Sequence, residues 1–155
     1  MSESPYNVED VILLEMAYVR LSAIKKAVEE LGLNHDNFKS NYTAYTSAAM
    51  SIMLAANAIR QVSMKFMKKH SHIPWRDFVL MANIVKDEVY DLELDALCNF
   101  VMNDFEKFYN ELEIIKDTEM AAACQKYLGE YAGADEEMDE KCQQLIDKGL
   151  RHKVQ

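Results

Sequence analysis

Residues 41–69, NYTAYTSAAMSIMLAANAIRQVSMKFMKK, decide the fold. Apolar and small residues recur there at alternating steps of four and three, the spacing that places side chains on one face of an α-helix. The members of this stripe are Tyr45, Ala49, Ile52, Ala56, Ile59, Ser63 and Phe66. The pattern predicts one long helix whose alanines allow another helix to approach closely, with methionines filling irregular core space.

The segments on either side repeat helical patterns of the same kind. The predicted helices cover residues 7–31, 41–69, 74–90, 93–115, 117–131 and 135–150. Asn7 is a suitable N-cap for the first of them, and Pro74 suits the first turn of the third. The last two helices form a tail that could dock on the bundle or extend as an arm for a partner, and the sequence leaves both open.

Composition supports one helical domain. Half of the 155 residues are hydrophobic, and the chain holds only 4 Gly and 2 Pro. A chain of this length can bury a full core, and so few turn residues argue against a turn-rich β fold. The sequence therefore predicts an all-α protein.

Cysteine usage and hydropathy give an expectation for the compartment. Cys98, Cys124 and Cys142 are odd in number and form no CxxC pair, which favours free thiols in a reducing environment. No apolar run approaches the roughly 20 residues that span a bilayer, and the N-terminal residues lack the pattern of a signal peptide. We expect a cytoplasmic protein with no membrane contact.

The net charge of -9 is unevenly distributed. Residues 37–86 hold seven Lys or Arg and one Asp, a net charge of +6, whereas residues 87–113 hold one Lys and nine acids, a net charge of -8. The total disfavours indiscriminate binding to nucleic acid, but the basic segment could meet RNA or an acidic partner. The sign changes at Asp87.

The sequence lacks the motifs of several common cofactor and metal sites. The chain has no GxGxxG, no HExxH and no Glu-x-x-His pair. His70 and His72 could hold a metal ion, but without a matching Cys or carboxylate pair they favour solvated side chains. The acids Asp87, Glu88, Asp91, Glu93 and Asp95 favour a solvated, partner-facing patch over a cation site. We predict no metal and no cofactor.

The stretch 48–90 resembles the HepT-like toxins of the HEPN superfamily of small helical ribonucleases. Residues 70–76, HSHIPWR, match the family's junction between two helices, and residues 81–90, MANIVKDEVY, match its motif helix. The resemblance covers about residues 8–115. It implies a HEPN-like four-helix up-down bundle over residues 1–115, to which residues 116–155 add a C-terminal helical extension.

The resemblance also implies an activity and partners. The family dimerises, and its active site, near the dimer interface, uses an Arg and a His to cleave RNA without a metal. Its usual partner is a minimal nucleotidyltransferase antitoxin, which attaches AMP to a Tyr shortly after the His. We therefore expect a homodimer that belongs to a toxin–antitoxin-type pair.

The family's catalytic residues are largely replaced in this chain. Its Arg position is Ala82, which cannot stabilise phosphate charge, while Asn83 matches the motif. The His position is Asp87, which can accept a proton but seldom donates one near pH 7, and which repels phosphate. The Tyr position is Val89, and Tyr90, the candidate for modification, comes one residue late, a turn of about 100° on a helix.

Three interpretations remain open. The first is a catalytically impaired binding or regulatory protein with a ribonuclease-like fold, a pseudoenzyme for which RNA is a doubtful ligand. The second is an active metal-independent ribonuclease with Asp87 as base and Lys86 or Arg76 on phosphate. The third is a helical adaptor or substrate-binding partner of a minimal nucleotidyltransferase. If the first is right, Ala82→Arg with Asp87→His should restore some cleavage.

Overall fold

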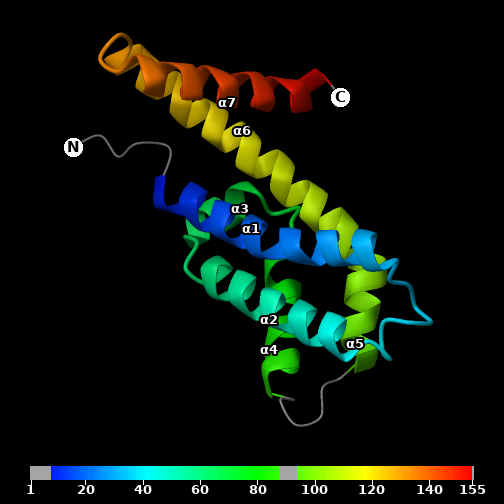
Figure 1. The fold of residues 1–155 in the computed structure, drawn as a ribbon. Coiled ribbons are helices and arrows are strands. Elements are labelled where there is room, and N and C mark those ends of the chain that lie inside the picture. Colours follow the sequence, from blue (N-terminus) through cyan, green and yellow to red (C-terminus); the bar gives the residue numbers. More distant parts are fainter. Residues whose placement is uncertain (1–7, 88–93, 155) are drawn as a thin grey trace.

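The computed structural model describes residues 8–87 and 94–154, which form helices joined by short connections (Figure 1). The helices α1, α2 and α4 and the run from α5 to α6 enclose one hydrophobic core, and no strand occurs among the described residues. The prediction of an all-α, HEPN-like bundle is confirmed.

The helices α1, Val8–Leu31, and α2, Tyr42–Ile59, form an antiparallel pair at the front of the bundle (Figure 1). The side chain of Asn41 caps α2 by accepting a hydrogen bond from the backbone of Ala44, with 3.1 Å between the heavy atoms. Four members of the predicted stripe, Ala49, Ile52, Ala56 and Ile59, are buried on α2, because this helix packs against both α1 and α4.

The prediction of one helix over 41–69 is wrong beyond Ile59. The chain turns at residues 60–63, and a short helix, α3, covers Met64–Lys69. The cause is Ser63, whose backbone N–H and hydroxyl donate to the two carboxylate oxygens of Asp10, at 2.8 and 2.7 Å. Ser63 also caps α3 by accepting from the backbone of Phe66. These polar contacts override the apolar periodicity.

The third predicted helix is present as α4, Trp75–Asp87. After the undescribed residues 88–93 come α5, Leu94–Asn99, and a π-helical turn, η1, Phe100–Asp104. The rings of Phe78, Phe100 and Phe108 meet in the core where α4, η1 and α6 come together, and Phe78 stacks on Phe108 with 4.6 Å between centroids.

The last bundle helix is longer than predicted. Instead of ending at Ile115, α6 runs unbroken over Phe105–Tyr131. Residues 115–118 contain no Gly or Pro to stop a helix, and the Thr118 hydroxyl donates back to the carbonyl of Ile114. The helix α6 therefore joins the bundle to the tail.

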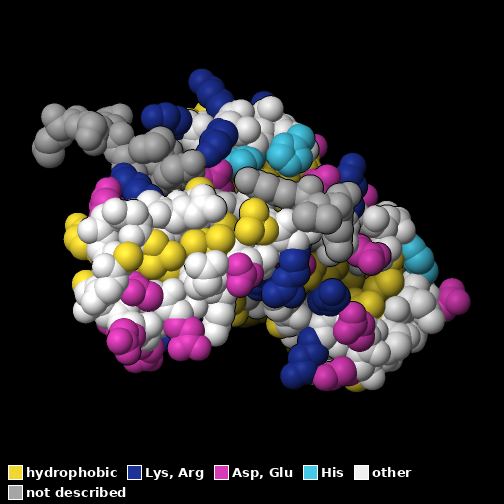
Figure 2. Space-filling view, turned by 90° about the horizontal axis from the view of Figure 1, so that it is seen from above, with side chains coloured by type: hydrophobic (Ala, Val, Ile, Leu, Met, Phe, Trp, Pro, Cys, Tyr) yellow, Lys and Arg dark blue, Asp and Glu magenta, His cyan; other side chains and the backbone are white. Residues whose placement is uncertain are grey.

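The tail docks on the bundle's own last helix. The helix α7, Glu136–Val154, folds back along the second half of α6 after Gly133, which has a positive φ of 90°. A small apolar cluster joins them, made by Cys124, Cys142 and Ile146. Figure 2 shows that acidic side chains gather near the connecting end of this hairpin. Among the described helices, none is both long and apolar enough to cross a bilayer.

Candidate functional site

The motif helix α4 turns its first motif position into the core. Ala82 is only 1% exposed and belongs to the main hydrophobic cluster, on a helix that packs against α2. Asn83, the next residue, is partly exposed. Because successive helical residues differ by about 100°, one of these two can face the core while the other reaches solvent. Of these two motif residues on α4, only Asn83 is therefore accessible from the surface.

An arginine from another helix end reaches Asn83. The guanidinium of Arg60, just after α2, donates from Nη2 to the Asn83 side-chain oxygen and from Nη1 to the Asn57 side-chain oxygen, the latter at 2.8 Å. Asn57 and Arg60 are exposed. Arg60 spans α2 and α4 with part of its planar, permanently charged group committed to amide oxygens. The structure thus places a cation beside the motif position that this chain retains.

The other predicted site residues lie apart from this contact or outside the described part. Arg76 is exposed in the first turn of α4. Lys86 and Asp87 are the last two residues of α4, and their side chains, like the whole of Tyr90, fall outside the described residues. The structure therefore brings Asn83 together with Arg60, and within the described side chains no contact links Asn83 to Arg76.

Arg60 is the residue that sequence reasoning missed. The sequence points to Arg76 and Lys86 as replacement cations because they are close to the motif along the chain. Arg60 is 23 residues from Asn83 and becomes its neighbour only because α2 and α4 pack together. Asn57 and Arg60, three residues apart near a helix end, were the available signal, since that spacing puts side chains on one face.

The contacts of the HSHIPW junction, residues 70–75, stabilise the turn between α3 and α4. Ile73 and Trp75 are buried, and the Trp75 indole donates to the backbone carbonyl of His70 at 3.0 Å. The ring of His70 lies 2.8 Å from a carboxylate oxygen of Glu119 on α6, which also accepts from Lys69 at 2.7 Å. His70 therefore fixes the α3–α4 turn against α6, which leaves His72 as the exposed histidine of the pair.

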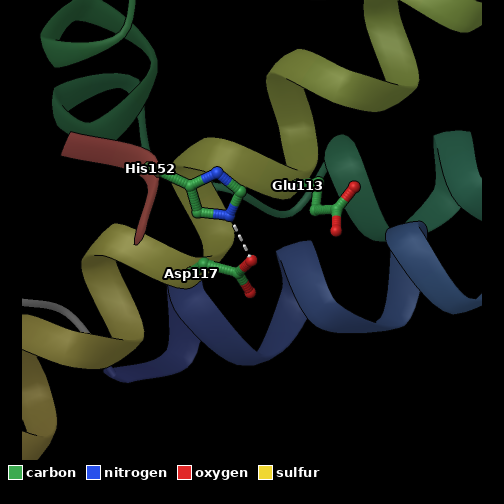
Figure 3. A group of neighbouring side chains, drawn as sticks. All are labelled: Glu113, Asp117 and His152. Carbon is green, nitrogen blue, oxygen red and sulfur yellow. Dashed lines mark hydrogen bonds and ion pairs between the residues drawn. The ribbon is translucent and has the colours of Figure 1, made fainter. Parts of the chain in front are cut away.

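Glu113, Asp117 and His152 form a second polar cluster, between α6 and α7, whose carboxylate and imidazole atoms lie within 4.8 Å of one another (Figure 3). Asp117 is 1% exposed, and its carboxylate lies 2.7 Å from the His152 ring. One imidazole and two carboxylates are a ligand set that zinc accepts.

Protein cations already pair with the buried carboxylate of this cluster. The carboxylate of Asp117 lies 3.2 Å from the ammonium of Lys116 and 3.6 Å from that of Lys148. Burial lowers the pKa of Lys116, but Asp117 and Glu15 outweigh burial and raise it, so Lys116 is held charged. We therefore assign the cluster to the docking of α7 on α6 by ion pairs.

Comparison with known proteins agrees with this architecture. The model of the family described as "Ribonuclease HepT-like" matches residues 20–115. A relative from Methanocaldococcus jannaschii, named "Gamma-glutamylcyclotransferase and putative RNase", is 26% identical over 77 residues, which is 50% of this chain and 35% of the relative. The chain thus spans about a third of that relative's length in the match. No solved structure matches. Since the family model covers more than half of the chain, the protein belongs to the HepT-like ribonuclease family.

Proposed function

We propose that this protein is a binding or regulatory member of a toxin–antitoxin-type pair, in which the RNA-cleaving site of the family is impaired. The observation that carries the proposal is the burial of Ala82. At this position the family resemblance calls for an arginine, which would stabilise the charge of the phosphate during cleavage. A buried methyl group cannot supply that charge, and the change to Asp87 removes the proton donor that histidine provides near pH 7.

The partner proposed for it is a minimal nucleotidyltransferase, with Tyr90 as the residue that would carry AMP. Co-expression of the two proteins, followed by affinity capture and mass spectrometry, tests this part. We expect a stable complex, and an adduct on Tyr90 that is absent from Tyr90→Phe. If the experiment finds no complex and no adduct, both the regulatory role in such a pair and the adaptor interpretation are ruled out.

Impaired cleavage is tested directly with purified protein, single-stranded RNA and tRNA in EDTA. The proposal expects no cleavage above a buffer control at equal protein concentrations. Cleavage that persists through further purification and disappears in Asp87→Ala would overturn it. Asp135→Ala, a change in the exposed α6–α7 connection, is the matched control for loss of a carboxylate.

The second candidate function is active, metal-independent cleavage by relocated residues, and the Arg60–Asn83 contact favours it. Arg60 brings the missing positive charge to the surface of α4 from a different helix. On this candidate, Arg60→Ala abolishes cleavage, whereas Arg20→Ala, the loss of an exposed arginine from α1, leaves it unchanged. If neither variant alters a measurable activity, Arg60 plays no part in it.

The protein is also proposed to form a homodimer. The support in this structure is an exposed apolar face on α1, where Ile12, Met16 and Val19 are each more than half exposed at steps of four and three. Analytical ultracentrifugation of wild type and Met16→Glu tests this face, with Met50→Glu, at an exposed methionine of α2, as the control. A monomeric wild type at micromolar concentration would contradict the proposal.

A further inference from the structure

Cys98, His35 and Asn103 form a chain of contacts on the side of the bundle that carries α5 and η1. The Cys98 sulfur lies 3.9 Å from Nδ1 of His35, and Nε2 of the same ring lies 3.0 Å from the side-chain oxygen of Asn103. The three residues come from α5, from the loop at 32–41 and from η1. A thiol, an imidazole and an amide therefore meet in the order that thiol-activating sites use.

The contact with Asn103 determines which ring nitrogen of His35 carries the proton. An amide oxygen can only accept a hydrogen bond, so Nε2 must be protonated and donate to it. In the neutral ring this leaves Nδ1 with a free lone pair. Since Nδ1 faces the Cys98 sulfur, the ring is set to accept the thiol proton.

The loop holds His35 in this place by contacts of its own. The side chain of Asn34 accepts from the backbones of Asp36 and Asn37, and Phe38 is fully buried in the core. Lys39 forms an ion pair with Asp95 on α5, the helix that carries Cys98. The backbone on both sides of His35 is thus anchored, and the exposed ring is oriented by its contacts with Cys98 and Asn103.

Within the described part of the chain, no histidine contact is found for the other two cysteines. Cys124 and Cys142 lie together between α6 and α7, and burial followed by the neighbouring Cys142 thiol raises the pKa of Cys124 to about 12. Exposure alone would rank Cys98 as the least reactive of the three, since Cys98 is 2% exposed, Cys142 5% and Cys124 9%. A mechanism that depends on His35 instead makes Cys98 the most reactive of the three.

We propose that Cys98, His35 and Asn103 form a thiol-activating triad whose ligand is a small hydroperoxide, and that Cys98 is the site of its reduction. His35 Nδ1 takes the thiol proton, and the sulfur attacks one peroxide oxygen. An S–O bond forms as the O–O bond breaks, and the departing alkoxide or hydroxide takes the proton from His35. Cys98 is oxidised by two electrons to sulfenic acid, and the hydroperoxide is reduced to an alcohol or water. Because Cys98 is only 2% exposed, a peptide substrate would find no room at its sulfur, and the proposed ligand is therefore a small one.

The test is competition among the three cysteines of the intact protein. The protein is treated with substoichiometric hydrogen peroxide, sulfenic acid is trapped with dimedone, and each cysteine peptide is quantified by mass spectrometry. We expect Cys98 to be labelled before Cys124 and Cys142, by about tenfold or more, because an unassisted thiol is only a few per cent ionised at pH 7. Labelling in the order of exposure would overturn the proposal.

Two variants separate activation from access. His35→Ala removes the ring that covers Cys98, so an access mechanism predicts faster labelling, whereas the triad predicts a loss of most Cys98 labelling. Asn103→Ala frees the ring tautomer and should reduce labelling by a smaller factor. Labelling of Cys124 and Cys142 in the same samples reports unfolding, since an unfolded chain would expose all three thiols alike. Faster Cys98 labelling in folded His35→Ala would overturn the triad.

Discussion

Gly149 on α7 lies against Ala121 on α6 with no space for a side chain between them. A Cβ added at Gly149 would sit 2.5 Å from the Ala121 Cβ and 2.9 Å from the backbone oxygen of Asp117. Both are shorter than real Cβ contacts, and one of the opposing atoms belongs to the helix backbone, which cannot swing aside. The absence of a side chain at Gly149 thus sets how closely the tail approaches the bundle helix.

Gly149→Ala should destabilise the α6–α7 hairpin, by about 1–3 kcal/mol as for other overpacked sites. Gly129→Ala is the matched control, because nothing lies within 4 Å of the added carbon and the change favours α6 by up to about 1 kcal/mol of helix propensity. Urea unfolding and limited proteolysis at α7 measure both. Equal stability of the two variants would mean that the close approach of Gly149 to α6 does not affect the free energy of unfolding.

Asp117→Ala should loosen the same hairpin from its polar side. The change leaves the buried ammonium of Lys116 paired with the partly exposed Glu15, and it removes the carboxylate that His152 contacts. Breaking a buried pair by removing one partner costs about 3–5 kcal/mol.

Urea unfolding and proteolysis at α7 measure this loss. Glu137→Ala, which breaks an exposed pair with Lys141, is the control and should change stability little, because surface pairs are screened by solvent. If the two losses are equal, solvent screens the Asp117 cluster as it does the surface pair.

The helical class and most of the core could be read from the sequence because burial follows a local period. The stripe residues Ile52, Ala56 and Ile59 are buried as their spacing requires. The break after Ile59 could not be read, since it depends on Asp10, more than fifty residues before Ser63. A hydrogen bond between distant residues leaves no periodic trace in either segment.

The site was predictable to a smaller extent. The motif positions Ala82 and Asn83 were identified along the chain, but a linear motif does not reveal that one faces the core and the other meets Arg60. The Cys98–His35 contact likewise joins residues 63 positions apart. Chemistry made by packing between helices becomes visible only when the helices are placed.

Alkaline pH should weaken the fold in part through Cys124. Burial and the Cys142 thiol raise its pKa from 9.0 to about 12, so the folded chain keeps a proton that the unfolded chain releases. The stability that this provides is complete below about pH 9 and is lost as the pH rises towards 12.

Urea unfolding from pH 7 to 10.5 should show a smaller alkaline loss in Cys124→Ser than in wild type. Both proteins retain Tyr18, whose pKa burial also raises, so the difference between their slopes isolates Cys124. Parallel curves, offset by a constant, would mean that this thiol titrates alike in both states.

Ala82→Arg should destabilise the bundle. Ala82 is 1% exposed in the main core, so an arginine there must bury its charge or force α4 away from α2, at a cost of about 3 kcal/mol or more. Leu80→Arg, on the same helix but at a residue that is 48% exposed, should change stability by only about 0.5 kcal/mol.

This expectation reverses the one drawn from the sequence for Ala82→Arg with Asp87→His. Because the arginine would not reach solvent without disturbing the α2–α4 contact, the double variant should lose stability and gain no cleavage. Thermal unfolding of Ala82→Arg, Leu80→Arg and the double variant, alongside the RNA assay in EDTA, decides between the two. A stable double variant that cleaves RNA would show that α4 can turn its first motif position outward, and that the burial of Ala82 follows from the small residue itself.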